Sequence, residues 1–275
     1  MPYARQTQWV LREWIASLRC QCVPGARALG LAYESAAIKG RFRRVGNAWA
    51  SHLQSSKQAI LQAAVQCTKR ERALIVGAGA CFDIPVPELA GLFDEVVLTD
   101  AVIGTEARNW ARRLPNRVRA IGWDATGFLA RLANARAVSD ANAIIALINE
   151  SAPEIPPRSE ADLTVSANCL SQLGLVAAEQ VDADDESDGC FQKCIDLAAA
   201  KHLAWLRGRA GVRVLLSDIA RLDVAPDGRE ISQERVFKNV PLPSPDRIWR
   251  WKIAPIPERS REYHRVHEVG VWIDG

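Results

Sequence analysis

The sequence predicts an α/β protein in which a mostly parallel β-sheet lies between two layers of helices. From residue 72 onward, short apolar runs alternate with helix-compatible stretches, which is the pattern of successive β-α-β units. A glycine-rich turn, Gly77-Ala-Gly79, ends the first apolar run, as expected where a strand passes into a loop. The last two β-like runs have no helix between them and therefore predict an antiparallel pair.

The predicted strands cover residues 73–77, 95–99, 117–122, 162–167, 212–217, 247–254 and 265–273. Right-handed crossovers between the first five, which are parallel, make a three-layer sandwich. The final two are expected together at a sheet edge. An extra helix is predicted at 143–149, because the link before the fourth strand is longer than usual.

Residues 1–70 are predicted to form a helical cap, and residues 71–275 the main domain. Apolar residues in the first section recur at steps of three and four, which is the spacing of a helix face. They are Trp9, Val10, Trp14, Ile15 and Leu18, and farther on Ala48, Trp49, His52, Leu53, Ile60 and Ala64. The dipeptide Pro24-Gly25 separates two helices. We expect this cap to pack on one end of the sheet and to shape a substrate pocket.

Composition excludes several classes of protein. Apolar residues make up 48% of the 275 residues and charged residues 24%, which are ordinary values for a soluble protein. No run of about 18 apolar residues occurs, so no membrane span is predicted. The first residues lack the apolar core of a secretion signal, which predicts a cytoplasmic location. The seven cysteines are odd in number and form no C-x-x-C pair, which predicts reduced thiols.

Charge is distributed unevenly, although the net charge is only +3. Residues 1–70 hold eleven Lys and Arg against two acids, whereas residues 150–190 hold ten acids against Arg158. Either these sections attract each other, or the basic one guides an anionic substrate or a nucleic acid. No nucleic-acid-binding module is readable, so a small molecule is the favoured partner, and we expect a monomer or homodimer.

The turn after the first strand predicts a site for a nucleoside-bearing cofactor. Gly77 and Gly79 allow a tight turn and a close approach of the backbone to a ligand, and Asp100 ends the second strand where a ribose diol could be held. Dinucleotide enzymes place a third glycine where this chain has Phe82, so a pyrophosphate-binding helix is disfavoured. No G-K-[ST] follows the turn, which excludes a Walker-type phosphate loop.

At these motifs the chain resembles the class I S-adenosylmethionine-dependent methyltransferases, whose first motif needs only a G-x-G turn and whose second strand ends in an acid. The resemblance implies a Rossmann-like sheet of seven strands, with the last strand inserted antiparallel, and S-adenosylmethionine as the cofactor. It also implies the residues of the site. They are Gly77, Ala78 and Gly79 at the methionine end, Asp100 and Ala101 at the ribose, Asp124 and Ala125 at the adenine, and Ser166, Ala167 and Asn168 beside the methyl group.

The chain departs from the pattern of this family at two places. Many members carry an acid two residues before the first glycine to hold the methionine amino group, and this chain has Ile75 there. Asp83, on the other side of the turn, is the candidate to replace it. The fourth strand is not followed by the [DNS]-P-P-[YFW] signature of enzymes that methylate exocyclic amines of bases, which weakens a base-methylating function.

Methyl transfer depends largely on positioning and on exclusion of water, so a protein base is not obligatory. His52 is the first candidate for such a base, beside the alternative that it only packs, and Asn168 is the other predicted catalytic residue. Arg41 and Arg44 either grip a carboxylate or face solvent. Four tryptophans either stack on a flat ligand or belong to the core: Trp49, Trp123, Trp249 and Trp251.

The predicted function is methyl transfer from S-adenosylmethionine to an unidentified small molecule. The alternatives are a non-catalytic S-adenosylmethionine-binding protein, an RNA-modifying methyltransferase and a nicotinamide-dependent oxidoreductase. No metal site is predicted. The acidic segment 179–189 is interpreted as a solvated loop or lid, because its glycine is misplaced for an EF-hand.

Overall fold

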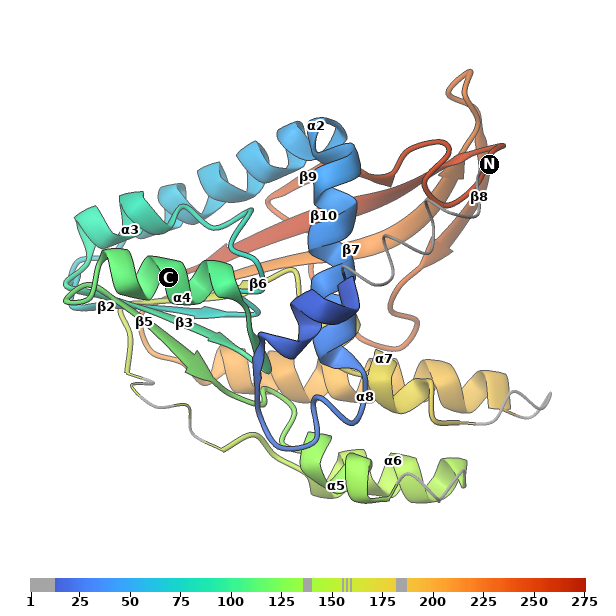
Figure 1. Cartoon of the computed structure of the whole chain (residues 1–275), viewed down its shortest axis with the longest axis horizontal. Coiled ribbons are helices and arrows are strands. Elements are labelled where there is room, and N and C mark those ends of the chain that lie inside the picture. The colour runs from blue at the N-terminus through green and yellow to red at the C-terminus, as the bar shows by residue number, and fades with distance from the viewer. Residues whose placement is uncertain (1–12, 136–139, 155, 157, 159, 182–186) are drawn as a thin grey trace.

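A computed structural model of the chain describes residues 13–135, 140–154, 156, 158, 160–181 and 187–275 (Figure 1). Its strands are β1 (Gln21–Cys22), β2 (Arg72–Val76), β3 (Glu95–Asp100), β4 (Val102–Ile103), β5 (Val118–Gly122), β6 (Leu163–Ala167), β7 (Val212–Val224), β8 (Glu230–Arg235), β9 (Arg247–Ala254) and β10 (His264–Asp274). Its helices are α2 (Leu31–Ala64), α3 (Val86–Leu92), α4 (Thr105–Arg113), α5 (Leu129–Asn134), α6 (Ala141–Glu150), η1 (Leu170–Gln172), α7 (Leu175–Ala178) and α8 (Ser187–Arg207). The extra helix predicted at 143–149 is confirmed as α6.

The central sheet has the order β5-β3-β2-β6-β7-β10-β9, and β8 pairs with β7 outside this path. The strands from β5 to β7 run parallel, whereas β10 is antiparallel to both β7 and β9. The mostly parallel Rossmann-like fold and the antiparallel pair are therefore confirmed. The last strand is inserted between β7 and β9, as the resemblance implied, whereas the dinucleotide-binding sheet has the order 3-2-1-4-5-6.

The sheet extends farther than the sequence predicted, because β7 continues from the predicted end at 217 to Val224 and pairs there with β8. The extension buries Ala220, Leu222 and Val224 in a small cluster with Val266 of β10. Every residue of β8 is exposed, so no apolar alternation marks this strand in the sequence.

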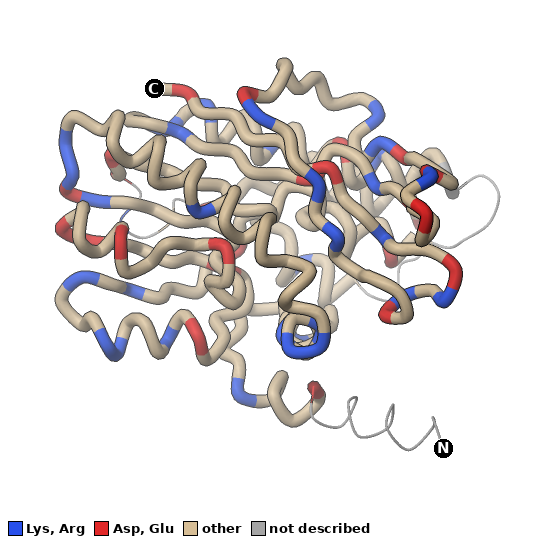
Figure 2. Tube along the Cα trace, turned by 90° about the horizontal axis from the view of Figure 1, so that it is seen from above, with Lys and Arg blue, Asp and Glu red and all other residues tan. Residues whose placement is uncertain are grey.

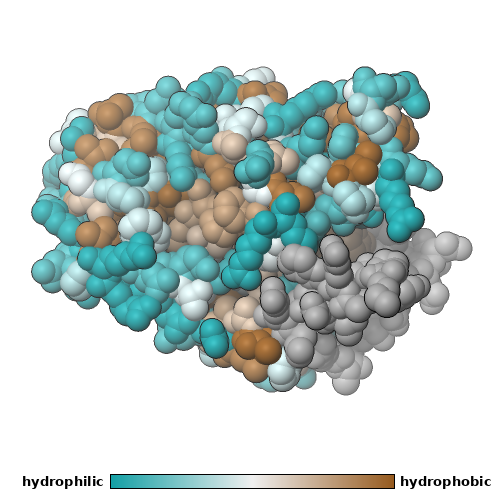
Figure 3. Space-filling view, turned by 45° about the horizontal axis from the view of Figure 1, so that its top comes forward, coloured by the Kyte–Doolittle hydropathy of each residue, from teal (hydrophilic) through white to brown (hydrophobic). Residues whose placement is uncertain are grey.

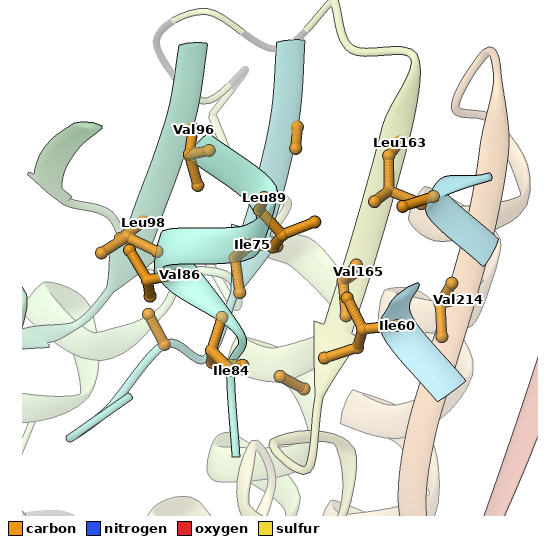
Figure 4. Packing of buried hydrophobic residues seen from close by; sticks show 14 of the residues in the cluster. Ile60, Ile75, Ile84, Val86, Leu89, Val96, Leu98, Leu163, Val165 and Val214 are labelled. Atoms are coloured by element: carbon orange, nitrogen blue, oxygen red, sulfur yellow. The ribbon is translucent and has the colours of Figure 1, made fainter. Parts of the chain in front are cut away.

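Strands β2, β3 and β6 of the parallel region are buried on both faces. On one face, Ile75 of β2, Leu98 of β3 and Val165 of β6 pack against Leu89 of α3 and Ile60 of α2 (Figure 4). The alternate residues of the same strands point to the opposite face, because successive side chains of a strand alternate. That face is covered by α5, α6, α7 and α8, which completes the three layers (Figure 1).

The long helix α2 connects the amino-terminal section to the sheet. It contains one residue with non-helical backbone angles, Val45, where the helix kinks just before Gly46. Its second half lies in the same buried cluster as β2 and β6 through Ala59, Ile60 and Ala63. This half therefore belongs to one of the helical layers, and the domain boundary at residue 70 stays a prediction. Trp9 and Val10 of the predicted first helix lie outside the described residues.

Basic and acidic residues are interspersed along the described trace (Figure 2). The basic residues of α2 find acids outside the 150–190 section: Lys39 pairs with Glu106, and Arg44 Nε donates to Glu258 Oε2 over 3.0 Å. Arg41 lies 3.6 Å from Glu258 as well. The carboxylate that these two arginines grip in the structure thus belongs to the protein.

On the face shown in Figure 3, hydrophobic residues lie among hydrophilic ones. None of the helices in the described part of the chain has the length and apolar character needed to cross a membrane. All seven cysteines are free thiols, in agreement with the prediction. The acidic segment 179–189 is described only in part, since residues 182–186 lie outside the described ranges.

Candidate functional site

A cavity of about 250 Å³ opens at the carboxyl ends of β2, β3, β5 and β6, beneath α2. Ligands of open α/β sheets bind at this edge, next to the point where the strand order reverses. Here the order reverses at β2, between β3 and β6. The lining residues predicted from the sequence are Gly77, Ala78, Gly79, Asp83, Asp100, Ala101, Asp124, Ala125, Ala167, Asn168 and His52.

The glycine turn forms the floor of this cavity. Gly77 (φ 76°) and Gly79 (φ 48°) both have left-handed backbone angles, which favour glycine. A Cβ atom on Gly77 would lie 2.6 Å from the Cβ atom of Cys169, so this glycine is also needed for packing against the end of β6. A Cβ atom on Gly79 would meet no heavy atom closer than 3.9 Å. Gly79 therefore borders open space, as a residue that admits a ligand must.

Asp100 holds the turn and still presents its carboxylate to the cavity. Its Oδ2 atom accepts a hydrogen bond from the backbone N–H of Gly79, and its Oδ1 atom accepts one from Val102, both at 2.9 Å. Burial raises the pKa of this carboxyl, and the backbone hydrogen bonds act in the opposite direction. A carboxylate has about four acceptor positions, so Asp100 keeps acceptor capacity for a ligand beside these backbone bonds.

Asp124 organises the loop after β5. Its Oδ1 atom accepts from the N–H of Thr126 over 2.8 Å and from the Thr126 hydroxyl, while Oδ2 accepts from the N–H of Leu129 over 2.9 Å. The carboxylate therefore satisfies backbone donors at the start of α5. Trp123, whose indole donates to the carbonyl of Glu154, adds an apolar wall at this end.

Asp83 and Asn168 meet across the cavity floor. The Asn168 amide donates to Asp83 Oδ2 over 2.6 Å and so ties the turn after β2 to the end of β6. The Oδ1 atom of Asn168 is buried and has no hydrogen-bond partner among the described residues. Burial raises the pKa of Asp83, and the hydrogen bond from Asn168 offsets part of this effect. The pair therefore offers two acceptor oxygens to a ligand with N–H donors.

Ser166 lies behind the cavity wall and does not line it. It is fully buried, and its Oγ atom lies 2.9 Å from Nε2 of His202 and 3.5 Å from Sγ of Cys169. Its neighbours Ala167 and Cys169 reach the cavity instead. Ser166 is thus not among the residues that line the cavity, and its predicted location beside the cofactor stays a prediction.

His52 lines the cavity from α2 and is only 2% exposed. Its Nδ1 atom accepts a hydrogen bond from the Trp249 indole over 3.0 Å, and its ring stacks on that of Trp251 at a centroid distance of 4.1 Å. Burial lowers the pKa of His52 to about 3, and the charge of His267 adds to this effect. The neutral ring thus carries its proton on Nε2, which makes it a hydrogen-bond donor toward the cavity.

The depressed pKa predicts that His52 makes the protein less stable in acid. Below the ordinary pKa of histidine near 6.5, His52 binds a proton in the unfolded chain but not in the folded one. The free energy of unfolding therefore falls as the pH drops toward about 3. Between about pH 7 and pH 5, the free energy of unfolding of the native chain should therefore fall by about 2 kcal/mol more than that of His52→Phe. Urea unfolding at both pH values measures this, and equal losses in the two proteins would contradict it.

Several lining residues were not predicted as part of the site. Leu31, Glu34, Ser35, Ile38, Trp49 and Leu53 come from α2, and Val76, Ala80 and Phe82 from β2 and the turn after it. Val102 belongs to β4, and Trp123, Thr126 and Leu129 lie between the end of β5 and the start of α5. Cys169, Gln172, Leu173 and Val176 follow β6, and Trp251 belongs to β9. Of these, the tryptophans had a signal in the sequence, since their abundance suggested stacking on a flat ligand. The apolar residues of α2 had none, because lining and core positions of a helix share one spacing.

Among the comparisons with known proteins, only the one with solved structures gives matches. No family model and no curated protein gives a significant match. One similar solved structure is a 1,6-didemethyltoxoflavin-N1-methyltransferase of Burkholderia thailandensis with bound 1,6-didemethyltoxoflavin and S-adenosylhomocysteine. Its sequence is 15% identical to this chain, and the TM-score is 0.34. The match covers 87% of this chain and 89% of that chain. Another, from a study of thioacetal formation during echinomycin biosynthesis, has 12% identity, a TM-score of 0.29, and coverage of 77% and 80%. Similarity at this level does not determine function.

Proposed function

We propose that this chain is a methyltransferase that binds S-adenosylmethionine and transfers its methyl group to a small molecule. The observation that carries the proposal is the carboxylate of Asp100 at the end of β3, which lines the cavity and is held there by the backbone of Gly79 and Val102. Two adjacent acceptors match the two hydroxyls of a ribose. The inserted antiparallel strand β10, which the dinucleotide-binding order lacks, supports the same cofactor.

The remaining residues of the cavity suit the other parts of this cofactor. Asp83 and the unpaired Oδ1 atom of Asn168 would hold the ammonium group of the methionine end, in place of the acid that is missing at Ile75. Gly79 would allow the methionine chain to pass close to the backbone, since the space beside it is open. Trp123 and Ala125 would enclose the adenine. This assignment gives the ammonium group a carboxylate partner in Asp83 and gives the ribose hydroxyls an acceptor in Asp100.

The bound cofactor supplies an activated methyl group on a sulfonium centre. The residues of the chain would position the reactants and exclude water from the cavity, since α2 covers the cavity and apolar side chains form much of its lining. His52 suits the role of a neutral donor that orients the acceptor, because its Nδ1 atom is already engaged by Trp249. Asn168 would position the methionine end and the acceptor relative to each other.

A nicotinamide cofactor fits less well. A dinucleotide needs a helix that starts directly after the glycine turn, so that its N-terminus faces the pyrophosphate. Here α3 begins only at Val86, beyond the segment that contains Phe82, and the Phe82 ring stacks on Phe42 of α2 at 3.9 Å between centroids. An RNA-modifying function is weakened because three of the five basic residues of α2 are already paired with acids: Lys39, Arg41 and Arg44.

The experiment that tests the proposal is calorimetry of the purified chain with S-adenosylhomocysteine, with NADH as the control ligand. We expect saturable binding of S-adenosylhomocysteine with a Kd of about 1–10 µM, and an increase in Tm that rises with its concentration. NADH should change neither signal. Binding of NADH in preference to S-adenosylhomocysteine would overturn the proposal in favour of an oxidoreductase.

A further inference from the structure

The part of the cavity opposite the ribose and adenine residues is walled by aromatic rings. Trp49 and His52 of α2, Phe82 of the turn after β2, and Trp251 of β9 all line it. We call these four side chains the aromatic wall. In the sheet order, Asp124 follows β5 at one edge and Trp251 lies on β9 at the other, so the wall and the adenine residues are at opposite sides of the cavity.

The rings of the wall are packed against one another and are held in place. Trp49 meets Trp251 edge to face at 5.1 Å between centroids, and Trp251 stacks on His52 at 4.1 Å. Phe42, at 3.9 Å from Phe82 and 5.7 Å from Trp49, connects the fourth ring to the others. The Trp49 indole also donates to the carbonyl of Ile253 over 3.0 Å. The wall is therefore a preorganised surface that loses little freedom when a ligand binds.

The wall also lacks the charges that an ionic ligand would need. No Lys or Arg is found among the described residues that line the cavity, so a carboxylate or phosphate would have no cation to pair with. The carboxylates of the lining are not part of the wall, since Asp83, Asp100 and Asp124 belong to the side assigned to the cofactor and Glu34 lies in the first half of α2. The wall itself carries no charge, because burial lowers the pKa of His52 to about 3. Its polar groups are N–H donors: the neutral His52 ring donates through Nε2, and Trp251 Nε1 is buried without a partner among the described residues.

We propose that the methyl acceptor is an uncharged, planar aromatic compound that lies against the aromatic wall and accepts a hydrogen bond from His52. This inference rests on the proposed function, since it treats the other side of the cavity as the cofactor site. Aromatic rings add offset-stacked or edge-to-face contacts beyond the burial of apolar area, and a saturated ligand of the same size makes none of them.

The test uses four compounds of one skeleton, measured by calorimetry with S-adenosylhomocysteine at saturation. 2-Naphthol is planar and uncharged, decahydro-2-naphthol is its saturated counterpart, 2-naphthoate is anionic and 2-naphthylmethylamine is cationic at neutral pH. We expect 2-naphthol to bind about tenfold more tightly than each of the others, equivalent to about 1.4 kcal/mol. If decahydro-2-naphthol bound as tightly as 2-naphthol, the acceptor would not need to be planar. If either ion bound more tightly than 2-naphthol, the acceptor would not need to be uncharged. Failure of all four compounds to bind would overturn the inference as a whole.

Two variants locate the binding. Trp251→Leu should weaken 2-naphthol about tenfold, whereas Trp251→Phe should retain most of the affinity because it keeps a ring. Trp14→Leu is the matched control, since Trp14 is 54% exposed and does not line the cavity. If Trp14→Leu and Trp251→Leu changed the affinity equally, 2-naphthol would not bind at the aromatic wall.

Two further titrations separate the two proposals. S-adenosylhomocysteine alone tests the proposed function, and the naphthyl series repeated without S-adenosylhomocysteine tests the wall. If S-adenosylhomocysteine binds and the four naphthyl compounds are not distinguished, only the inference about the acceptor fails. If 2-naphthol binds selectively and S-adenosylhomocysteine does not bind, the proposed function fails.

Discussion

Replacement of Asp100 by Ala should weaken the binding of S-adenosylhomocysteine about 100-fold. The carboxylate lines the cavity, and two hydrogen bonds from ribose hydroxyls to a charged group would contribute about 3 kcal/mol together. Calorimetry of the native chain and the variant measures the difference. Asp100→Asn should fall between the two, because the amide keeps one acceptor oxygen and the shape of the side chain.

The loss must be separated from damage to the turn, since Asp100 also accepts hydrogen bonds from the backbone of Gly79 and Val102. A 2′,3′-dideoxy analogue of S-adenosylhomocysteine provides this control. The native chain and Asp100→Ala should bind the analogue with similar affinity, because the hydroxyls that Asp100 would hold are absent. If the variant loses the analogue as severely as the natural ligand, the effect comes from the turn and the ribose role is refuted.

Gly77→Ala should be the most destabilising small substitution in the site. The alanine would adopt a left-handed backbone angle, which costs about 1–2 kcal/mol, and its Cβ atom would lie 2.6 Å from Cys169. Overpacking adds about 1–3 kcal/mol. We expect a total near 3 kcal/mol and a Tm lower by roughly 10 °C, measured by thermal unfolding without ligand.

Gly79→Ala is the matched control for this substitution. It has the same sign of φ, but the space beside it is open, so its cost in stability should be only about 1–2 kcal/mol. Its methyl group would instead enter the cavity and reduce the affinity for S-adenosylhomocysteine. The two glycines should thus separate into one that mainly affects folding and one that mainly affects binding; equal losses of stability would show that the cavity is closed beside Gly79.

Much of the fold was predictable because the strands of the parallel region carry a strong local signal. The run that contains Leu74 and Ile75 is apolar throughout, since both of its faces are buried. The same reasoning ended β7 too early, because Ser217 and Asp218 interrupt the apolar run in the middle of that strand. These two polar side chains are buried, and Asp218 accepts a hydrogen bond from the Ser171 hydroxyl there. A tertiary contact of this kind leaves no trace in the local pattern.

The candidate site was predictable where a short motif determines the geometry, as at Gly77, Gly79 and Asp100. No such motif determines the location of Ser166. The side of the sheet to which a residue points changes with a one-residue shift, and a resemblance does not fix that register. The link between Asp83 and Asn168 joins residues that are far apart in sequence. The sequence did not predict this link, which only the tertiary structure shows. The residue roles in the site remain proposals.

The insertion of β10 determines how the far edge of the sheet is supported. In the described sheet β9 pairs with β10 alone, so the backbone of the strand that presents Trp251 depends on β10. The residues assigned to the nucleotide follow β2, β3 and β5, at the other side of the sheet order. Removal of β10 should therefore release the indole of Trp251 while sparing much of the layers around β2 and β3, which a shift of tryptophan fluorescence would report.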